Sequence, residues 1–238
     1  MIRFIDEKVV PLVAVAAIGS TLIAMGMVFF YAPVEQTMGI VQKIFYIHVP
    51  SAMAAYAGFT VAAVCSLLYL FKPREHWDIG AVVGAELGLL CCFFVLFSGS
   101  LWGYKAWGTW WTWDPQLTAT FILFLLYGGY LLLRYFGGAS KKMKKIAAVL
   151  AVVAFVDIPI IHYAVRLWGG LHPVVEREGG DGLAPDIALV FQVSMVAFLL
   201  VFLTLLWMRF RVRLSEARLD ALYLEVEDLA MVREEKTR

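Results

Sequence analysis

The sequence predicts an all-α fold: a polytopic membrane protein with six transmembrane helices and both termini in the cytoplasm. Three observations lead to this prediction. Of the 238 residues, 62% are hydrophobic and 16% are charged, and the mean hydropathy is +0.79, which lies outside the range of soluble globular domains. The chain contains six apolar runs, each near the roughly 20 residues needed to cross a bilayer. Lys and Arg are concentrated in one set of the loops between these runs.

The apolar runs begin and end at positions that suit helices across a membrane. They occupy residues 9–31, 50–71, 79–102, 117–135, 146–165 and 187–208. The first run is kept as a span because it is too long for the apolar core of a signal peptide and lacks an A-x-A exit. The second begins at Pro50, a residue that suits the first turn of a helix. The fourth follows Asp114 and Pro115, which favour an N-cap and a first helical residue.

The third and fifth runs each hold one carboxylate at membrane depth, Glu86 and Asp157. Ionisable groups in a span are costly and usually face the interior of the bundle. We interpret both as ties between helices, although a solute transporter would also use such groups. The three cysteines have no CxxC spacing and are interpreted as small buried side chains; they are Cys65, Cys91 and Cys92.

The distribution of cations sets the orientation, because cytoplasmic loops carry the excess of Lys and Arg. The loops that share a side with the termini hold most of these residues, so that side is assigned to the cytoplasm. The outer side receives residues 32–49, 103–116 and 166–186, and its only cations are Lys43, Lys105, Arg166 and Arg177. The formal net charge of +1 gives no basic face for a nucleic acid, so that class of partner is excluded.

The chain divides into two parts at the end of the sixth run. Residues 1–208 form the transmembrane domain, and residues 209–238 form a cytoplasmic tail that we expect to be helical. Apolar residues recur in the tail at three- and four-residue intervals, as in a coiled coil: Leu219, Leu222, Val226 and Leu229. Both a helix lying on the membrane and a dock for a cytoplasmic subunit fit this spacing.

A tryptophan-rich stretch, WGTWWTWDPQLT, lies in the second outer loop. Residues 102–118 hold five of the eight tryptophans, which exceeds the one or two expected of an interfacial aromatic belt. A helical segment would place Trp107, Trp110 and Trp111 on one face, whereas an extended one would place Trp111 and Trp113 together. Asp114, at the end of the stretch, is predicted to cap the next helix and also suits the orientation of a ligand or a partner loop.

Two histidines belong to the other outer loops, so topology brings them to the same face as the tryptophans. His48 lies in YIHVPSA and His172 in GGLHPVVE, where the two preceding glycines permit a sharp turn. His76 is expected in a solvated cytoplasmic loop. His162 is expected to be a hydrogen-bonded interior residue of the fifth span.

A flat apolar macrocycle would use this combination of side chains. Porphyrin faces pack against indole rings, and heme iron accepts axial imidazoles from both sides. The propionates would favour the four outer cations. The competing class is a b-type cytochrome, which would hold histidine pairs within facing helices near the middle of the membrane.

These motifs resemble the CcmC/CcmF/CcsA family of heme-handling proteins, whose signature is a tryptophan-rich WWD domain on the outer face. WGTWWTWDPQLT has the form of that signature, YIHVPSA and GGLH resemble the segments of its heme histidines, and DIPIIHY resembles its fifth helix. The length and the six spans are most similar to the CcmC, or heme exporter protein C, members. A compact CcsA-like synthetase component is the alternative within the family.

The resemblance implies a heme-presenting scaffold in the cytoplasmic (inner) membrane rather than an enzyme. It implies binding of heme b on the periplasmic face, with His48 and His172 as axial ligands and Trp107, Trp110, Trp111, Trp113 and Asp114 around the ring. The partners implied are the heme chaperone CcmE, the ABC-type subunits CcmA and CcmB, and the small CcmD. The chain has no GxxxxGK[ST] pattern, so ATP hydrolysis would belong to a partner subunit.

Overall fold

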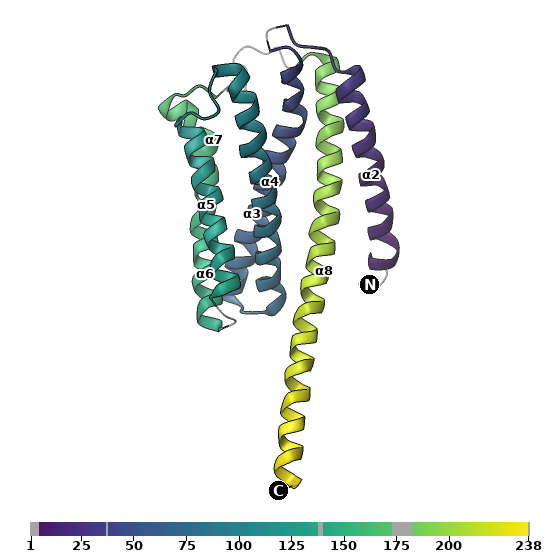
Figure 1. Ribbon diagram of the computed structural model, residues 1–238, viewed down its shortest axis with the longest axis vertical. Coiled ribbons are helices and arrows are strands. Elements are labelled where there is room, and N and C mark those ends of the chain that lie inside the picture. The colour runs from purple at the N-terminus through teal and green to yellow at the C-terminus, as the bar shows by residue number, and fades with distance from the viewer. Residues whose placement is uncertain (1–4, 37, 138–139, 173–182, 238) are drawn as a thin grey trace.

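The protein is a bundle of long helices, shown in Figure 1. The computed structural model describes residues 5–36, 38–137, 140–172 and 183–237, and these residues form no β-strand. Six helical segments among them are long and apolar enough to cross a membrane, which confirms the all-α, six-span prediction. The elements are the short helical turns η1 (Ile5–Val9), η2 (Met27–Tyr31) and η3 (Ile40–Ile44), and the helices α2 (Val10–Gly26), α3 (Phe45–Phe71), α4 (Glu75–Trp107), α5 (Pro115–Phe136), α6 (Lys141–Phe155), α7 (Asp157–Trp168) and α8 (Pro185–Thr237).

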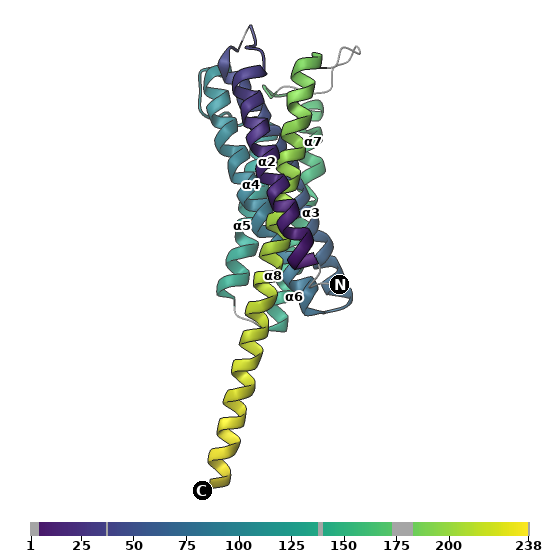
Figure 2. The same cartoon turned by 90° about the vertical axis from the view of Figure 1, so that its right-hand side faces the viewer.

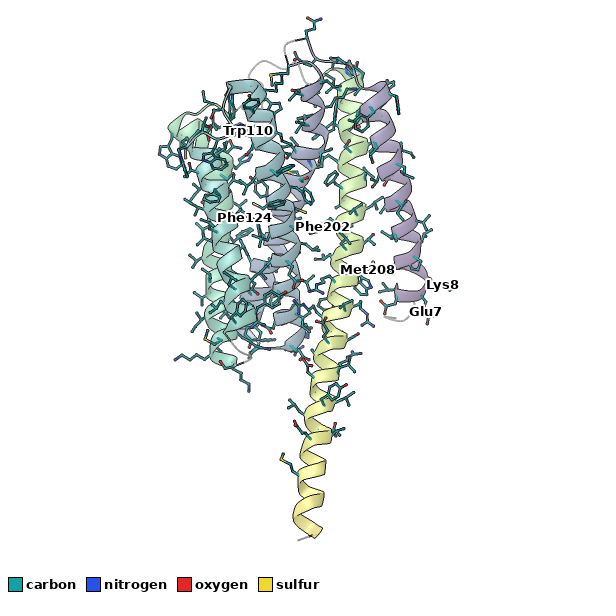
Figure 3. The ribbon with its side chains drawn as sticks, in the orientation of Figure 1. Glu7, Lys8, Trp110, Phe124, Phe202 and Met208 are labelled. Atoms are coloured by element: carbon teal, nitrogen blue, oxygen red, sulfur yellow. The ribbon has the colours of Figure 1, made fainter. Side chains whose placement is uncertain are left out.

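The bundle has two distinct ends. One, which we call the loop end, carries the ends of η2, α4 and α7 and the starts of η3, α5 and α8. The other, the tail end, carries the connection 72–74, the end of α5, the starts of α6 and η1, and the point where α8 leaves the bundle, as both Figures 1 and 2 show. In Figure 3, Trp110 marks the loop end, whereas Glu7 and Lys8 lie toward the tail end.

Helix α3 begins earlier than the sequence predicts. Pro50 lies inside the helix rather than in its first turn. The preceding turn stays helical because its aromatic side chains are packed: Tyr46 is buried, and Phe45 stacks on Phe191 of α8 with ring centroids 5.0 Å apart. This packing offsets the loss of the one hydrogen bond that Pro50 cannot donate to the helix.

The fifth span is two helices, α6 and α7, separated at Val156. Pro159 explains the break, because proline has no N–H to donate to the carbonyl four residues earlier and its ring crowds that carbonyl. At the break, the N–H of Val156 bonds to the carbonyl of Val153, three residues earlier, at 3.1 Å. Asp157 lies at the break, and its Oδ2 is buried without a hydrogen-bond partner among the described residues.

Helices α3 and α4 make the most extensive contact in the bundle. Glycines recur every fourth residue on the contact face of α4, at Gly80, Gly84 and Gly88. Small residues at this spacing let two helix backbones approach closely. Toward the other side of α3, Phe59 stacks on Tyr127 of α5 at 4.0 Å, and the Tyr127 hydroxyl donates to the Ala151 carbonyl of α6 at 3.0 Å.

Ion pairs join the helices toward the tail end. Asp78 of α4 pairs with Arg134 of α5 at 2.7 Å and with Lys144 of α6 at 2.8 Å. Asp6 accepts hydrogen bonds from Trp207 and Arg211 of α8, at 2.8 and 2.9 Å. Because these carboxylates lie near the N-termini of their helices, they also favour the helix dipoles. The contacts tie η1, α5 and α6 to α4 and α8.

Glu86 of α4 holds the start of the α8 extension. It pairs with Arg209 at 2.6 Å and with Arg213, and it accepts the hydroxyl of Tyr135 of α5. The interpretation of Glu86 as a tie between helices is therefore confirmed. From this point α8 continues as one helix to Thr237, beyond the rest of the bundle (Figure 2).

Replacing Glu86 is expected to loosen α8. Glu86→Gln leaves Arg209 without its counter-charge and Arg213 paired with the more exposed Glu216. The free energy of unfolding therefore falls by an amount on the order of 2 kcal/mol, between the values for exposed and buried pairs. Thermal unfolding in detergent measures this change. Glu216→Gln is the control, because Glu216 pairs with Arg213 from an exposed position. Equal melting temperatures for the two variants would show that Glu86 does not anchor α8.

Candidate functional site

All seven residues predicted for the site lie at the loop end. His48 is in the first turns of α3, Trp107 is the last residue of α4, and Asp114 immediately precedes α5. The remaining tryptophans belong to the connection between α4 and α5, and His172 follows α7 by four residues. These positions come from helices of alternating direction, which return to the same end at every second connection. The convergence expected from the topology is therefore present in the fold.

His48 is fixed against helix α4. Its Nδ1 lies 2.9 Å from the Ser98 hydroxyl oxygen, and that hydroxyl donates to the Phe94 carbonyl at 2.6 Å. The backbone of Gly99 approaches the same ring, since a Cβ added there would lie 3.1 Å from His48 Cε1. The imidazole is thus enclosed on its α4 side by one polar and one small residue.

Asp114 connects two of the loops through its two carboxylate oxygens. Oδ1 accepts the N–H of Leu117 at 2.9 Å, which confirms the predicted N-cap of α5. Oδ2 accepts the N–H of Leu171, the residue before His172, at 3.3 Å. The side chain is buried, so both bonds form in an environment where they are strong. Asp114 therefore ties the end of the tryptophan stretch to the loop of His172.

The glycine pair after α7 makes this contact possible. Gly169 ends the helix with a φ of 74°, and Gly170 has a φ of 155°. Residues other than glycine rarely adopt either backbone angle. The turn brings Gly170 so near Asp114 that an added Cβ would lie 3.4 Å from Oδ2. His172 follows Leu171, whose N–H Asp114 binds, so the turn brings it beside the end of the tryptophan stretch.

The tryptophan stretch is a loop rather than a helix. Gly108 ends α4 in the left-handed region, with a φ of 73°, and its N–H bonds to the Tyr104 carbonyl. Trp107 therefore does not share a helical face with Trp110 and Trp111, and that alternative is wrong. The Thr109 hydroxyl donates to the Trp111 carbonyl at 3.1 Å and stabilises the turn.

The indole rings form pairs in different directions. Trp110 stacks on Tyr104, with centroids 4.4 Å apart and an interplanar angle of 16°. Trp111 and Trp113 meet edge to face at 5.8 Å and 78°, as the extended alternative predicts for their proximity. Trp107 meets Trp102 edge to face at 5.4 Å. Because Trp110 and Trp113 are more than half exposed, the loop offers aromatic faces to a ligand.

The available donors suit a heme better than a bare metal ion. Among the described residues no group of three or more His, Cys, Asp and Glu side chains is placed to hold a metal, whereas heme needs only one or two axial ligands from the protein. Three polar atoms of the same region are buried without hydrogen-bond partners: Trp111 Nε1, Thr112 Oγ1 and Thr118 Oγ1. The indole N–H and the two hydroxyls can each donate a hydrogen bond, and the propionate carboxylates of a heme are acceptors for such groups.

The four outer cations that were expected to favour the propionates are less central to the site. Lys43 donates to the Phe29 carbonyl at 3.1 Å, Lys105 lies in the last turn of α4, and Arg166 lies in the last turn of α7. Arg177 lies outside the described residues.

Two histidines differ from expectation. His76 is in the first turn of α4 at the tail end, against Trp77, rather than in a loop. His162 lies at the surface of α7 against Tyr163, rather than in the interior of the bundle. The residues missed by the sequence interpretation are Ser98 and Gly99. The signal was present, because the small polar stretch Ser98-Gly99-Ser100 interrupts an apolar run at the level of His48.

Comparison with known proteins agrees with this architecture. A family model described as heme exporter protein C matches residues 1–225. The heme exporter protein C of Bradyrhizobium diazoefficiens is 35% identical over 204 residues, 84% of this chain and 77% of that protein. The protein of the same name from Paracoccus denitrificans is 33% identical over 218 residues, 90% of each chain. The Escherichia coli K12 protein is 32% identical over 205 residues, 85% and 82% of the two chains. This chain belongs to the heme exporter protein C (CcmC) family.

Proposed function

We propose that this chain binds heme b at the loop end and presents it to the heme chaperone CcmE during cytochrome c maturation. Membership of the family gives the chain a role in heme handling for cytochrome c biogenesis, as a membrane component rather than an enzyme. The finer assignment is carried by one observation: Asp114 joins the end of the tryptophan loop to the loop of His172 by accepting the N–H of Leu171.

In this proposal His48 and His172 are the axial ligands of the heme iron. Trp107, Trp110, Trp111 and Trp113 contribute aromatic surface beside the ring, and Asp114 holds the loop of the second ligand in place. A bound heme would supply a vinyl group for attachment to a histidine of the chaperone, and this chain would hold the ring with that edge exposed. The residues of this chain bind and orient the ring, and the indoles exclude water from it.

The orientation of the chain follows the distribution of charge. The tail end carries most of the Lys and Arg residues, so it faces the cytoplasm together with both termini. The loop end faces the periplasm across the cell inner membrane. CcmA and CcmB supply the ATP hydrolysis that this chain has no P-loop to perform, and CcmD completes the complex.

The positions of the histidines argue against a b-type cytochrome. His48 and His172 lie at the loop end, His76 lies at the tail end, and His162 is exposed on α7. These four described histidines therefore form no facing pair in the middle of the bundle. Electron transfer across the membrane through heme would need such pairs. Ligands at one surface suit delivery of heme to an external partner.

The absorption spectrum of the full-length chain, purified after co-expression with the chaperone, tests the ligands. We expect His48→Ala and His172→Ala each to lose or strongly change the low-spin heme signal, because each removes one axial imidazole. His76→Ala is the control, since His76 lies at the opposite end of the bundle. Unchanged spectra in both single variants, with the fold intact, would reject the assignment and direct attention to His162.

A further inference from the structure

The hydrogen bonds around Ser98 determine which nitrogen of His48 carries a proton. A serine hydroxyl has one hydrogen to donate, and here the carbonyl of Phe94, at 2.6 Å, accepts it. The oxygen can therefore only accept from the His48 ring 2.9 Å away. This arrangement favours the tautomer in which Nδ1 carries the hydrogen and the lone pair of the neutral imidazole is on Nε2.

We propose that Ser98 is a positioning residue that fixes His48 in the Nδ1–H tautomer and aims Nε2 at the heme iron. This inference rests on the proposed function, because it takes His48 to be an axial ligand. A metal-bound histidine commonly donates its second ring N–H to an acceptor, which orients the ring and makes it a stronger ligand. Ser98 is the acceptor for His48.

The surrounding helix keeps this acceptor in place. Ser98 lies on α4, whose glycine face packs tightly against α3, so the two helices hold a fixed separation at the site. Gly99 lets the His48 ring lie close to the α4 backbone; an added Cβ would push on Cε1 from 3.1 Å. The position of the ring is thus set by two adjacent residues, one through a hydrogen bond and one through the space it leaves.

The test compares hemin-loaded full-length protein carrying Ser98→Ala, Ser98→Thr or Ser100→Ala. Ser100 is the matched control, because its hydroxyl also donates to a carbonyl four residues earlier, that of Leu96 at 2.9 Å. The readouts are the low-spin absorption spectrum, the midpoint potential of the bound heme, and the rate of heme transfer to apomyoglobin.

We expect Ser98→Ala to release heme about 10- to 100-fold faster, the usual effect of removing a hydrogen-bond partner of a metal ligand. The midpoint potential should shift to a more positive value, since an imidazole without an Nδ1–H acceptor donates less electron density to ferric iron. Ser98→Thr keeps a hydroxyl and should restore both values, and Ser100→Ala should match the native protein.

Each other outcome is decisive. If His48→Ala loses the low-spin signal but Ser98→Ala matches Ser100→Ala in all three readouts, the role of Ser98 is rejected and the proposed function stands. If Ser98→Thr is as altered as Ser98→Ala, Ser98 acts through its volume and the tautomer assignment is overturned. If His48→Ala keeps the native spectrum, His48 is not a ligand, and both proposals fail.

Discussion

Gly84→Ala is expected to prevent the accumulation of folded protein in the membrane. A Cβ at this position would lie 2.6 Å from the backbone nitrogen of Ala62 and 2.7 Å from the carbonyl oxygen of Gly58. Both are backbone atoms of α3, so no side chain can rotate away and the helices must separate. Overpacking of a rigid contact usually lowers the free energy of unfolding by about 1–3 kcal/mol. We expect the cost of Gly84→Ala to lie at or above the upper end of this range. The amount of protein in isolated membranes and its melting temperature in detergent measure the effect.

Gly129→Ala is the matched control for this prediction. Gly129 also lies in the interior of a long helix, α5, but an added Cβ there would meet nothing within 4 Å. Because alanine favours a helix by about 1 kcal/mol over glycine, this variant should be at least as stable as the native chain. If Gly84→Ala accumulated and melted like Gly129→Ala, the close approach of α3 and α4 would be wrong.

Substitutions of Asp114 are expected to separate its two roles. Asp114→Ala removes both hydrogen bonds, so α5 loses its cap, at about 1 kcal/mol, and the loop of His172 loses its attachment. Asp114→Asn can keep the cap through its amide oxygen, but its amide nitrogen cannot accept the N–H of Leu171. The asparagine variant should therefore unfold near the native temperature and yet bind hemin about 10-fold more weakly, since loss of one ordered contact leaves His172, the proposed second ligand, loosely held.

Ser140→Ala shows what the loss of a cap does by itself. Ser140 caps α6 by accepting the N–H of Met143 at 3.3 Å, and it lies at the tail end, away from the site. This variant should lose stability without a change in hemin affinity, as titration of the absorption spectrum would show. Native hemin affinity in Asp114→Asn would mean that the contact with Leu171 does not position His172.

The six spans could be predicted because their signal is local and large. Each apolar run is long enough to cross a bilayer by itself, and the N-cap at Asp114 depends on residues adjacent in sequence. The start of α3 could not be placed in the same way, because the turn before Pro50 depends on Phe191, which is distant in sequence. The break at Val156 could in principle have been predicted from Pro159. The apolar run 146–165 is, however, long and hydrophobic enough to be read as one unbroken span.

The candidate site, too, could be predicted only in part from the sequence. Topology was sufficient to bring His48, His172 and the tryptophans to one end of the bundle. Whether the tryptophan stretch is helical or extended was left open, and it depends on a single left-handed residue, Gly108. The interruption of an apolar run by Ser98-Gly99-Ser100 was visible in the sequence, but the role of Ser98 was not, because it depends on the His48 ring, which lies on the neighbouring helix α3.

Helix α8 also has a mechanical consequence. Its 53 residues extend about 80 Å at 1.5 Å per residue, and they run without a break from the loop end to well beyond the tail end. A rod of this kind transmits an axial displacement along its whole length. Near its first turns Phe191 stacks on Phe45, three residues before His48. A pull or a twist applied to the part of α8 beyond the tail end therefore reaches the turn that carries a proposed heme ligand, at the loop end.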